Sequence, residues 1–357
     1  MRKLIRNILL YLNIIVAVAL LLSYTAVHIS PEKFTLPAFF GLAYPYILLA
    51  NILFLLFWIV KLRREAIISF VVIMLGITHL NNYIRFGTRR IEDYSFSLLS
   101  YNIRLFNHLE GNDRSDNNVI ELLKKENPDI ICMQEFYLDG THADIKNNFE
   151  AKLNKDYQIH YKSLSMPGRR FYGIVTLSSF PIINRGDVVH PNSSSLTIFS
   201  DIVIGADTIR VYNNHLQSFR LRRIKSSFLE EISGREQNDL MREIRSLSVS
   251  LKEGFIQRAK QSMVLRKHIE NSPYPVIVCG DFNDTPVSYS YRKIRKNLKD
   301  AFVEAGNGAG FTYRDKYPPN RIDYILYSGN IFCTGFSINR VKFSDHYPIS
   351  GYFRIKN

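Results

Sequence analysis

The feature that most constrains this fold is a series of short polar motifs, each at the edge of an apolar run. In chain order they are Ser100-Tyr101-Asn102, Gln134-Glu135, Asn214-His215-Leu216, Gly280-Asp281-Phe282-Asn283, Arg321-Ile322-Asp323-Tyr324 and Ser344-Asp345-His346. Polar side chains that follow strands converge when those strands share one edge of a sheet. The spacing therefore predicts a fold that gathers these motifs at one place.

From Tyr94 onward the pattern alternates short strands with helices. Two helices are predicted, over residues 117–126, where Pro128 follows the end, and over residues 255–270. The predicted strands are 96–101, 129–133, 157–161, 172–177, 196–204, 208–212, 275–279, 322–327, 332–338 and 349–354. Several of these strands are apolar without alternation, which is typical of strands covered on both faces. The sequence therefore predicts an α/β fold in which one sheet packs on another, with helices outside.

The first ninety residues have a different character. Three apolar stretches cover residues 7–29, 38–60 and 66–84. About 20 apolar residues span a bilayer as a helix, so the first two are strong candidates for transmembrane helices and the third is marginal. A buried helical bundle is the alternative, but nothing polar here would form its solvated face. A signal peptide is a second alternative, although the first stretch exceeds the usual apolar length of roughly 7–15 residues.

Basic residues predict the orientation of these stretches, because loops rich in Lys and Arg stay in the cytoplasm. Residues 1–90 contribute +8 of the net charge of +14. Arg2, Lys3 and Arg6 precede the first stretch, and Lys61, Arg63 and Arg64 lie between the second and the third. Three spans would place the rest of the chain outside the cytoplasm, whereas Arg85, Arg89 and Arg90 favour the opposite placement.

Composition excludes some classes of protein. A hydrophobic content of 46% excludes a disordered chain. The three cysteines match neither the spacing of a zinc site nor an even-numbered disulfide framework, and Cys132 and Cys279 lie inside apolar runs. Residues 91–357 carry a net charge of only +6, which fits an anionic substrate without requiring one.

The polar motifs supply carboxylates, amides and two histidines. Such a set suits a hard divalent cation held by oxygen atoms, next to a His/Asp pair that handles protons and phosphate charge. Each residue alone has a simpler explanation, since a lone Glu135 after a strand is more often a surface group and a lone His346 is more often structural. Asp323 is a candidate to orient His346 by hydrogen bonding to one ring nitrogen.

These motifs, in this order, resemble the endonuclease/exonuclease/phosphatase superfamily, which includes nucleases, sphingomyelinases and inositol polyphosphate phosphatases. The resemblance covers about residues 94–357. It implies a four-layer α/β/β/α sandwich of the deoxyribonuclease-I-like type. The predicted organisation is therefore a membrane segment over residues 1–90, with two to three transmembrane helices, and a catalytic domain over residues 91–357.

The resemblance also implies roles for the motif residues, with Mg²⁺ or Mn²⁺ as the cofactor. Glu135 is the main metal ligand, assisted by Asn102 and Asp345. Asp281 positions or deprotonates the attacking water, and Asn283 holds that water and the phosphate.

His346 contacts the phosphate with Asp323 as its partner, and His215 stabilises the phosphate or protonates the leaving group. Tyr212 occupies a position where some members bind phosphate, although a strand aromatic is an equally good interpretation. A segment rich in charge, residues 217–252, follows His215. It is either a solvated helical excursion or a surface for an anionic substrate or lipid headgroups, since Arg220, Arg222, Arg223 and Lys225 cluster there.

The expected function is metal-dependent hydrolysis of a phosphodiester by a membrane-anchored enzyme. The expected partners are the lipid bilayer and an anionic phosphoester, either nucleic acid or phospholipid. A nuclease is the first expectation, because much of the superfamily cleaves nucleic acid. Membrane tethering favours a phospholipid or sphingomyelin phosphodiesterase, to which Lys162, Arg169 and Arg170 are equally suited, and a small phosphoester is a further alternative. A catalytically silent binding module is remote, because all the acidic and histidine positions are present.

Overall fold

The chain divides into two compact units. The computed structural model describes residues 2–87, 91, 93–104, 115–139, 153, 155–166, 170–191, 193, 195–219, 237–314 and 319–356. One unit, here the helical unit, comprises Met1–Leu80, Gln217–Met263 and Val287–Lys293. The other, here the sheet unit, comprises Asn81–Leu216, Val264–Pro286 and Ile294–Asn357.

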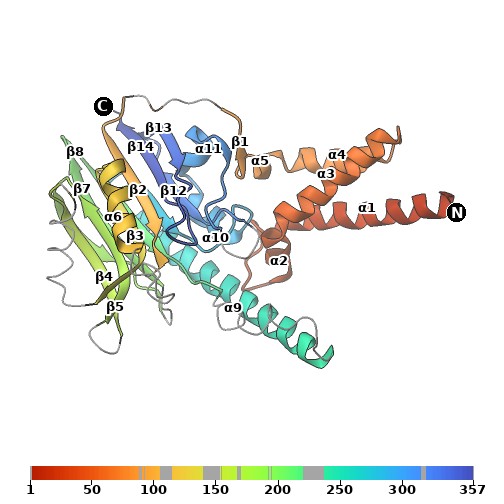
Figure 1. Ribbon diagram of the computed structural model, residues 1–357, viewed down its shortest axis with the longest axis horizontal. Coiled ribbons are helices and arrows are strands. Elements are labelled where there is room, and N and C mark those ends of the chain that lie inside the picture. The colour runs from red at the N-terminus through yellow and green to blue at the C-terminus, as the bar shows by residue number, and fades with distance from the viewer. Residues whose placement is uncertain are drawn as a thin grey trace. The chain divides into compact units, whose positions relative to one another are not determined.

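The sheet unit is built on two six-stranded sheets (Figure 1). The first, here the β2 sheet, has in order β13 (Ile331–Ile338), β14 (Ile349–Ile355), β2 (Phe96–Asn102), β3 (Ile130–Asp139), β5 (Arg170–Ser178) and β4 (Gln158–Met166). The second, here the β9 sheet, has in order β10 (Lys299–Asp300), β12 (Asp323–Tyr327), β9 (Val276–Asp281), β8 (Asp207–His215), β7 (Leu196–Ile204) and β6 (Ile182–Asp187). A short pair, β1 (Ile84–Arg85) with β11 (Gly308–Ala309), lies outside both sheets.

The main core lies between the two sheets. It joins apolar side chains of the β2 sheet, such as Leu98 and Ile130, to side chains of the β9 sheet, such as Val211 and Ile277. All four are completely buried. Strands buried on both faces explain why their sequences lack alternation, so the predicted arrangement of two packed sheets is confirmed.

Helices cover the outer faces of both sheets. Helix α6 (Ser115–Glu126) packs Val119 and Leu123 against Leu99 and Met133 on the outer face of the β2 sheet. On the β9 sheet, His268 near the end of α9 (Gln237–Glu270) lies against the ring of Tyr212 in β8, with ring centroids 5.5 Å apart. Two short helices, α10 (Tyr289–Arg295) and α11 (Ala301–Ala305), follow, and Asp300 caps α11 by accepting hydrogen bonds from two backbone N–H groups.

The helical unit begins with α1 (Arg2–Thr25), α2 (Leu36–Leu42), α3 (Tyr44–Val60), α4 (Ala66–Leu75) and α5 (Ile77–Leu80). Among the described residues, one helix, α1, is long and apolar enough to cross a membrane. A second candidate exists only if α2 and α3, which are bent by 67° at their junction, count as one span. A helix of this kind near an N-terminus is either a membrane anchor or a signal sequence.

The prediction of about three transmembrane helices is therefore wrong in its count. Proline in the first turn of α3 helps explain the break, since proline cannot continue a preceding helix, and it separates α2 from α3 within the second predicted stretch. Gly76 ends α4 after 10 residues within the third. Helix α4 rises only about 15 Å, half the thickness of a bilayer core.

Polar side chains lie inside the packed helices α1, α3 and α4. The amide of Asn13 donates to Ser69 Oγ at 2.6 Å and accepts from Trp58 Nε1 at 3.0 Å. Ser69 Oγ in turn donates to Asn51 Oδ1 at 3.4 Å, and Asn13, Asn51 and Ser69 are completely buried. We call these four residues the polar lock.

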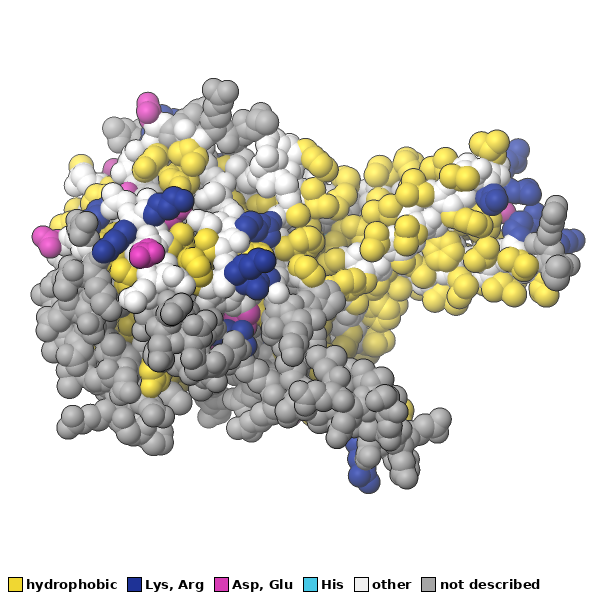
Figure 2. All heavy atoms as spheres, in the orientation of Figure 1, with side chains coloured by type: hydrophobic (Ala, Val, Ile, Leu, Met, Phe, Trp, Pro, Cys, Tyr) yellow, Lys and Arg dark blue, Asp and Glu magenta, His cyan; other side chains and the backbone are white. Residues whose placement is uncertain are grey.

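The outside of these helices is apolar. Figure 2 shows hydrophobic side chains over their surface, with Lys and Arg at their far end. Many large apolar side chains are more than one-third exposed, among them Leu4, Ile8, Ile15, Val18, Leu49, Leu53, Leu56, Ile59, Ile67, Phe70 and Leu75. A polar interior under an apolar exterior is the reverse of a water-soluble bundle.

Candidate active site

The six motifs meet because of strand direction. Strands β2 and β3 are parallel, as are β8 and β9. Asn102, the last residue of β2, pairs with Gln134 in the middle of β3, and His215 pairs with Asp281 where β8 and β9 both end. Strand β12 is antiparallel to β9 and starts where β9 ends, with Asp323 opposite Asp281. Each sheet therefore contributes one half of the site.

Asp281 lies at the centre of the site. Its side chain is 1% exposed. Oδ2 accepts a hydrogen bond from Asn102 Nδ2 at 2.9 Å, and Oδ1 accepts from the backbone N–H of Asn283 at 2.8 Å. The same Oδ2 is 3.7 Å from His346 Nε2 and 3.9 Å from His215 Nε2. Two histidines therefore face one buried carboxylate.

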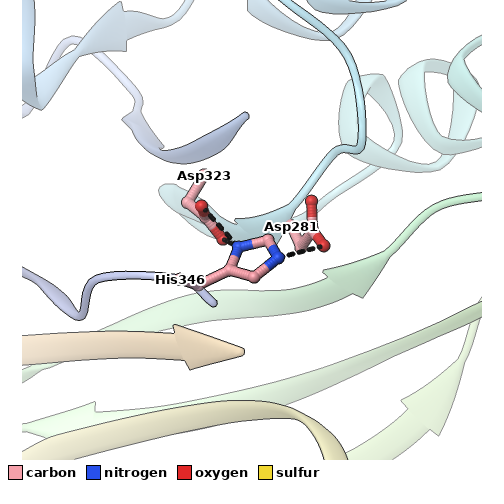
Figure 3. Close-up of side chains that lie close together, drawn as sticks. All are labelled: Asp281, Asp323 and His346. Atoms are coloured by element: carbon pink, nitrogen blue, oxygen red, sulfur yellow. Dashed lines mark hydrogen bonds and ion pairs between the residues drawn. The ribbon is translucent and has the colours of Figure 1, made fainter. Parts of the chain in front are cut away.

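His346 is held between two aspartates (Figure 3). Its Nδ1 is 2.9 Å from Asp323 Oδ2 and 3.1 Å from Oδ1, which leaves Nε2 directed at Asp281. Asp323 is fixed in turn by its own backbone N–H, which donates to Thr312 Oγ1 at 3.1 Å. The predicted partnership of Asp323 with His346 is thus present in the geometry.

The electrostatics of this cluster follow from burial and charge. Burial raises the pKa of Asp281 to about 6; the charge of His346 opposes that rise, while the charge of Asp323 adds to it. Burial by itself lowers the pKa of His346, but the negative charges of Asp323 and Asp281 outweigh burial and raise that pKa to about 10. At neutral pH the cluster therefore contains an imidazolium between two carboxylates.

Glu135 stands at a distortion of β3. The register of β3 with β5 shifts between Met133 and Phe136, and Glu135 has a left-handed φ of 50°. Non-glycine residues seldom adopt this conformation, and it is concentrated at functional sites. The bulge brings Glu135 Oε1 to 3.5 Å from Asn102 Nδ2 and to 3.5 Å from His215 Nε2.

His215, the last residue of β8, has a tyrosine on its other side. Its Nδ1 is 3.1 Å from the hydroxyl of Tyr172 on β5. Its Nε2 is buried and lacks a hydrogen-bond partner among the described residues, although it points toward Glu135 and Asp281.

Asp345 joins the site through an arginine and a serine. Arg104 Nε is 3.3 Å from Asp345 Oδ2, and the backbone N–H of Arg104 donates to Asn102 Oδ1 at 3.1 Å. Ser344 Oγ donates to the backbone carbonyl of Asn102 at 2.8 Å. Arg104 also has a left-handed φ, of 48°.

Asn283 lies beside Asp281, also in a left-handed conformation, with φ of 53°. Its side-chain amide donates to the carbonyl of Leu216 at 3.0 Å, which ties the end of β9 to the residue after His215.

Tyr212 lies apart from the other candidates, which favours the interpretation as a strand aromatic over that as a phosphate-binding residue. Its hydroxyl contacts His268 Nδ1 at 2.8 Å, on the helix-covered face of the β9 sheet. Side chains alternate along a strand, so a residue three positions before His215 faces the opposite side. The alternative interpretation, a strand aromatic, fits this placement.

Two other predicted groups fall partly or wholly outside the described residues. Five of these basic residues lie outside the described residues: Arg169, Arg220, Arg222, Arg223 and Lys225. Of Arg170, only the backbone is described. Lys162 forms an ion pair with Asp187 at the edge of the β2 sheet. Of the segment 217–252, the part from Gln237 onward is helical.

The donor set suits a hard cation. Among the described residues, Asp281, Asp323 and His346 form a cluster with ligand atoms within 4.8 Å of one another. Asp323 is, however, committed to His346 Nδ1. Glu135 is the more accessible carboxylate, with its side chain 20% exposed against 1% for Asp281. Oxygen atoms of Glu135, Asn102 and Asp345 match the preference of Mg²⁺ or Mn²⁺ better than a histidine nitrogen does.

Three residues at the site have weak local sequence signals or none. Arg104 stands two positions after Asn102, and this proximity is its only signal. Tyr172 and Thr312 reach the site through tertiary contacts with His215 and Asp323, and no local pattern marks them.

Comparison with protein families gives two matches. The family described as the endonuclease/exonuclease/phosphatase family matches residues 99–346, which include all six motifs from Leu99 of β2 to His346. A domain of unknown function matches residues 6–83. No curated protein matches the chain.

Solved structures with the same fold share little sequence with this chain. An endonuclease/exonuclease/phosphatase family protein from Leptotrichia buccalis C-1013-b is 14% identical, with a TM-score of 0.53 over 73% of this chain and 100% of its own. A protein from Bacteroides vulgatus, described in the same terms, is 18% identical, with a TM-score of 0.53 over 73% of this chain and 99% of its own. Truncated TDP2 of Caenorhabditis elegans is 22% identical, with a TM-score of 0.50 over 72% of this chain and 97% of its own.

Proposed function

Because the chain belongs to the endonuclease/exonuclease/phosphatase family, we propose that it is a membrane-anchored, divalent-metal-dependent phosphoesterase that hydrolyses phosphodiester bonds. A nuclease-like activity is the first expectation. The observation that carries the proposal is the convergence of Asp281, His346 and Asp323 with Glu135 and Asn102 at one edge of the two sheets.

The residues of the site suit an in-line attack of water on phosphorus. With a pKa of about 6, Asp281 is ionised at neutral pH and able to take a proton from the attacking water. The amide of Asn283 lies beside that carboxylate and would orient the water and a phosphate oxygen.

Negative charge builds on the phosphate oxygens and on the leaving oxygen during this attack. The His346 imidazolium, fixed by Asp323, would stabilise the phosphate charge, and His215 would act at the phosphate or the leaving oxygen. Glu135, Asn102 and Asp345 would hold Mg²⁺ or Mn²⁺. When bound, this ion supplies Lewis-acid stabilisation of the same developing charge.

The helical unit supports membrane anchoring. The polar lock hides amide and hydroxyl groups between α1, α3 and α4, while the outer faces of these helices are apolar. Interhelical hydrogen bonds inside an apolar exterior are the arrangement expected in lipid. We therefore propose the lipid bilayer as the partner of α1 and of the α2–α3 pair.

The proposed placement of the sheet unit is extracytoplasmic. The N-terminal end of α1, the C-terminal end of α3 and the start of α4 carry basic residues, as the positive-inside rule expects of cytoplasmic ends (Figure 2). Two spans alone, α1 and the α2–α3 pair, would leave the sheet unit on the cytoplasmic side, so this placement needs a further crossing, which length and composition alone do not identify, by residues 66–80. They contact α1 at two levels, since Ser69 binds Asn13 and the carbonyl of Val72 accepts from Tyr24 Oη at 2.9 Å.

The activity is tested on the full-length chain in detergent, with Mg²⁺ or Mn²⁺ and with EDTA as the metal-free control. The substrates are plasmid DNA, RNA, sphingomyelin vesicles, a chromogenic phosphodiester and a chromogenic phosphomonoester. Cleavage of the polynucleotides supports the first expectation. Cleavage of sphingomyelin alone would favour the alternative of a phospholipid phosphodiesterase, and turnover of a phosphomonoester alone would favour a small-molecule phosphatase.

Two variants test the assignment of residues. Glu135→Gln and His346→Ala are each expected to lower kcat by about 100-fold or more, because the first weakens binding of the metal ion and the second removes a positive charge that faces the phosphate. Glu304→Gln, at a half-buried glutamate of α11, is the matched control and should keep full activity. Circular dichroism checks that all variants fold. Turnover at the wild-type rate in either site variant would contradict the assignment. Inactivity of the wild-type protein on every substrate would favour a catalytically silent binding module.

A further inference from the structure

The two histidines of the site have partners of different chemistry. His346 is held at Nδ1 by a carboxylate, Asp323, at 2.9 Å. His215 is held at Nδ1 by a phenol, that of Tyr172, at 3.1 Å. The Nε2 atoms of both rings face the same oxygen of Asp281. The two histidine rings are therefore placed alike at Nε2, and the main difference between them is the group that contacts Nδ1.

The surroundings of His215 specify where its proton lies. Nε2 is 3.5 Å from Glu135 Oε1 and 3.9 Å from Asp281 Oδ2. A lone pair on Nε2 would be repelled by these two carboxylate oxygens, whereas an N–H group is attracted to them. A neutral imidazole has one N–H, so with the proton on Nε2 the other nitrogen, Nδ1, must accept. Tyr172 is then the donor.

We propose that Tyr172 is a positioning residue that holds His215 in the tautomer with its proton on Nε2, facing the reacting phosphate. The proposal rests on the phosphodiesterase function proposed above and makes His215 a hydrogen-bond donor through Nε2 in either of the two roles considered for it. In this tautomer, Nε2–H donates a hydrogen bond to a phosphate oxygen or to the leaving oxygen. The imidazolium next to Asp323 supplies the positive charge.

The backbone supports this assignment, because Tyr172 is placed rigidly. Gly173, the next residue of β5, is buried, and a Cβ atom there would lie 2.1 Å from the carbonyl oxygen of Lys162 on β4. The close approach of β4 to β5 at Gly173 fixes the strand beside Tyr172. The tyrosine and histidine rings meet at 64° with centroids 6.3 Å apart, which keeps the imidazole plane in one orientation.

The first test removes only the hydroxyl group. In the full-length protein, Tyr172→Phe should lower kcat on the cleaved phosphodiester by about 10-fold, the effect typical of losing a partner that orients a functional histidine. KM should stay within about twofold, because the hydrogen bond from Nε2 strengthens as negative charge develops in the transition state, so that its loss acts mainly on kcat. Tyr352→Phe is the matched control, since Tyr352 is a half-buried strand tyrosine paired with Ser97, at the opposite end of β2 from Asn102.

A double-mutant comparison separates positioning from a direct or structural role. The side chain of His215→Gln keeps an N–H donor and has no tautomers. Adding Tyr172→Phe to His215→Gln should therefore change kcat by less than about twofold. A further loss of about 10-fold in that background would show that Tyr172 acts independently of His215, and it would overturn the proposal.

A spectroscopic readout is independent of activity. In metal-free full-length protein labelled with ¹⁵N-histidine, the signal missing from His215→Gln identifies His215. Its Nδ1 should resonate as an unprotonated nitrogen and its Nε2 as a protonated one, and Tyr172→Phe should shift the two toward each other. A protonated Nδ1 in the wild-type protein would refute the tautomer even if phosphodiesterase activity is found. Absence of that activity, with the expected spectrum, would refute the proposed function and leave the tautomer assignment intact.

Discussion

At the scale of single residues, the site is a set of groups that fix one another. Asp323 holds one nitrogen of His346, and the other nitrogen faces Asp281, whose oxygens are held by Asn102 and Asn283. Each carboxylate would be costly to bury alone. The positive charge on His346 makes the burial of both carboxylates possible, so the three residues act as one unit.

This coupling predicts a pH dependence of stability. The pKa of His346 is raised in the folded protein from 6.5 to about 10. The stabilisation that its charge provides is therefore fully present below pH 6.5 and is lost as the pH rises toward 10. The midpoint of thermal unfolding, measured in EDTA between pH 6.5 and 10, should fall more in the wild-type protein than in His346→Gln. Parallel curves for the two proteins would contradict the assigned charge.

At the scale of strands and turns, the site depends on backbone conformations that few residues adopt. Three residues of the site have a left-handed backbone conformation: Glu135, Asn283 and Arg104. Each of them forms a hydrogen bond with Asn102 or Asp281. Gly280 has a φ of 125° and pairs with Asn214 across β8 and β9. A Cβ atom at Gly280 would lie 2.0 Å from the carbonyl oxygen of Asn214.

Gly280→Ala should therefore be strongly destabilising, by about 2–3 kcal/mol. The new methyl group would push β9 away from β8 and displace both Asp281 and His215. Urea denaturation measures the free energy of unfolding, and an activity assay measures the displacement. Gly329→Ala is the control, because a Cβ atom there meets nothing within 4 Å. Equal stability of the two variants would show that the close approach at Gly280 is unimportant.

The elements that the sequence predicts well are those whose pattern is local. The apolar runs over residues 96–101, 275–279 and 349–354 became β2, β9 and β14 with bounds shifted by at most two residues. The motif residues at their ends were identified because a polar group that ends an apolar run needs an explanation. Strand β6 is exposed at Ile183 and Asn184 and lacks such a run, so the sequence does not predict it. Tyr212 stands three positions before His215, so strand alternation by itself predicts that the two side chains face opposite sides of the sheet.

At the scale of the whole molecule, the sequence predicted too many spans from apolar length alone. The break between α2 and α3 and the end of α4 at Gly76 depend on single residues within otherwise apolar stretches. Apolar composition also could not reveal the polar lock, because Asn13, Asn51 and Ser69 are isolated in the sequence and meet only when α1, α3 and α4 pack.

The proposed orientation predicts a protease pattern. Protease added to intact cells should cleave the chain after residue 84 and leave a membrane-bound fragment that contains α1 to α4. An epitope tag before Arg2 should stay protected, because the basic end of α1 is proposed to be cytoplasmic. Protection of the whole chain in intact cells, with cleavage only after lysis, would place the sheet unit in the cytoplasm.

The division of the site between two sheets has a further effect. Asn102, Glu135 and His346 come from the β2 sheet or its ends, whereas His215, Asp281 and Asp323 come from the β9 sheet. The apolar interlayer and cross-sheet hydrogen bonds, such as those from Asn102 to Asp281 and from Gln134 to Asn213, keep these halves in register. An error of about 1 Å between reacting groups is enough to cost about 100-fold in rate. The rate of turnover therefore reports the alignment of the two sheets more sensitively than a measurement of secondary structure does. Replacing a large side chain deep in the interlayer with a smaller one should lower kcat before it changes the secondary-structure signal.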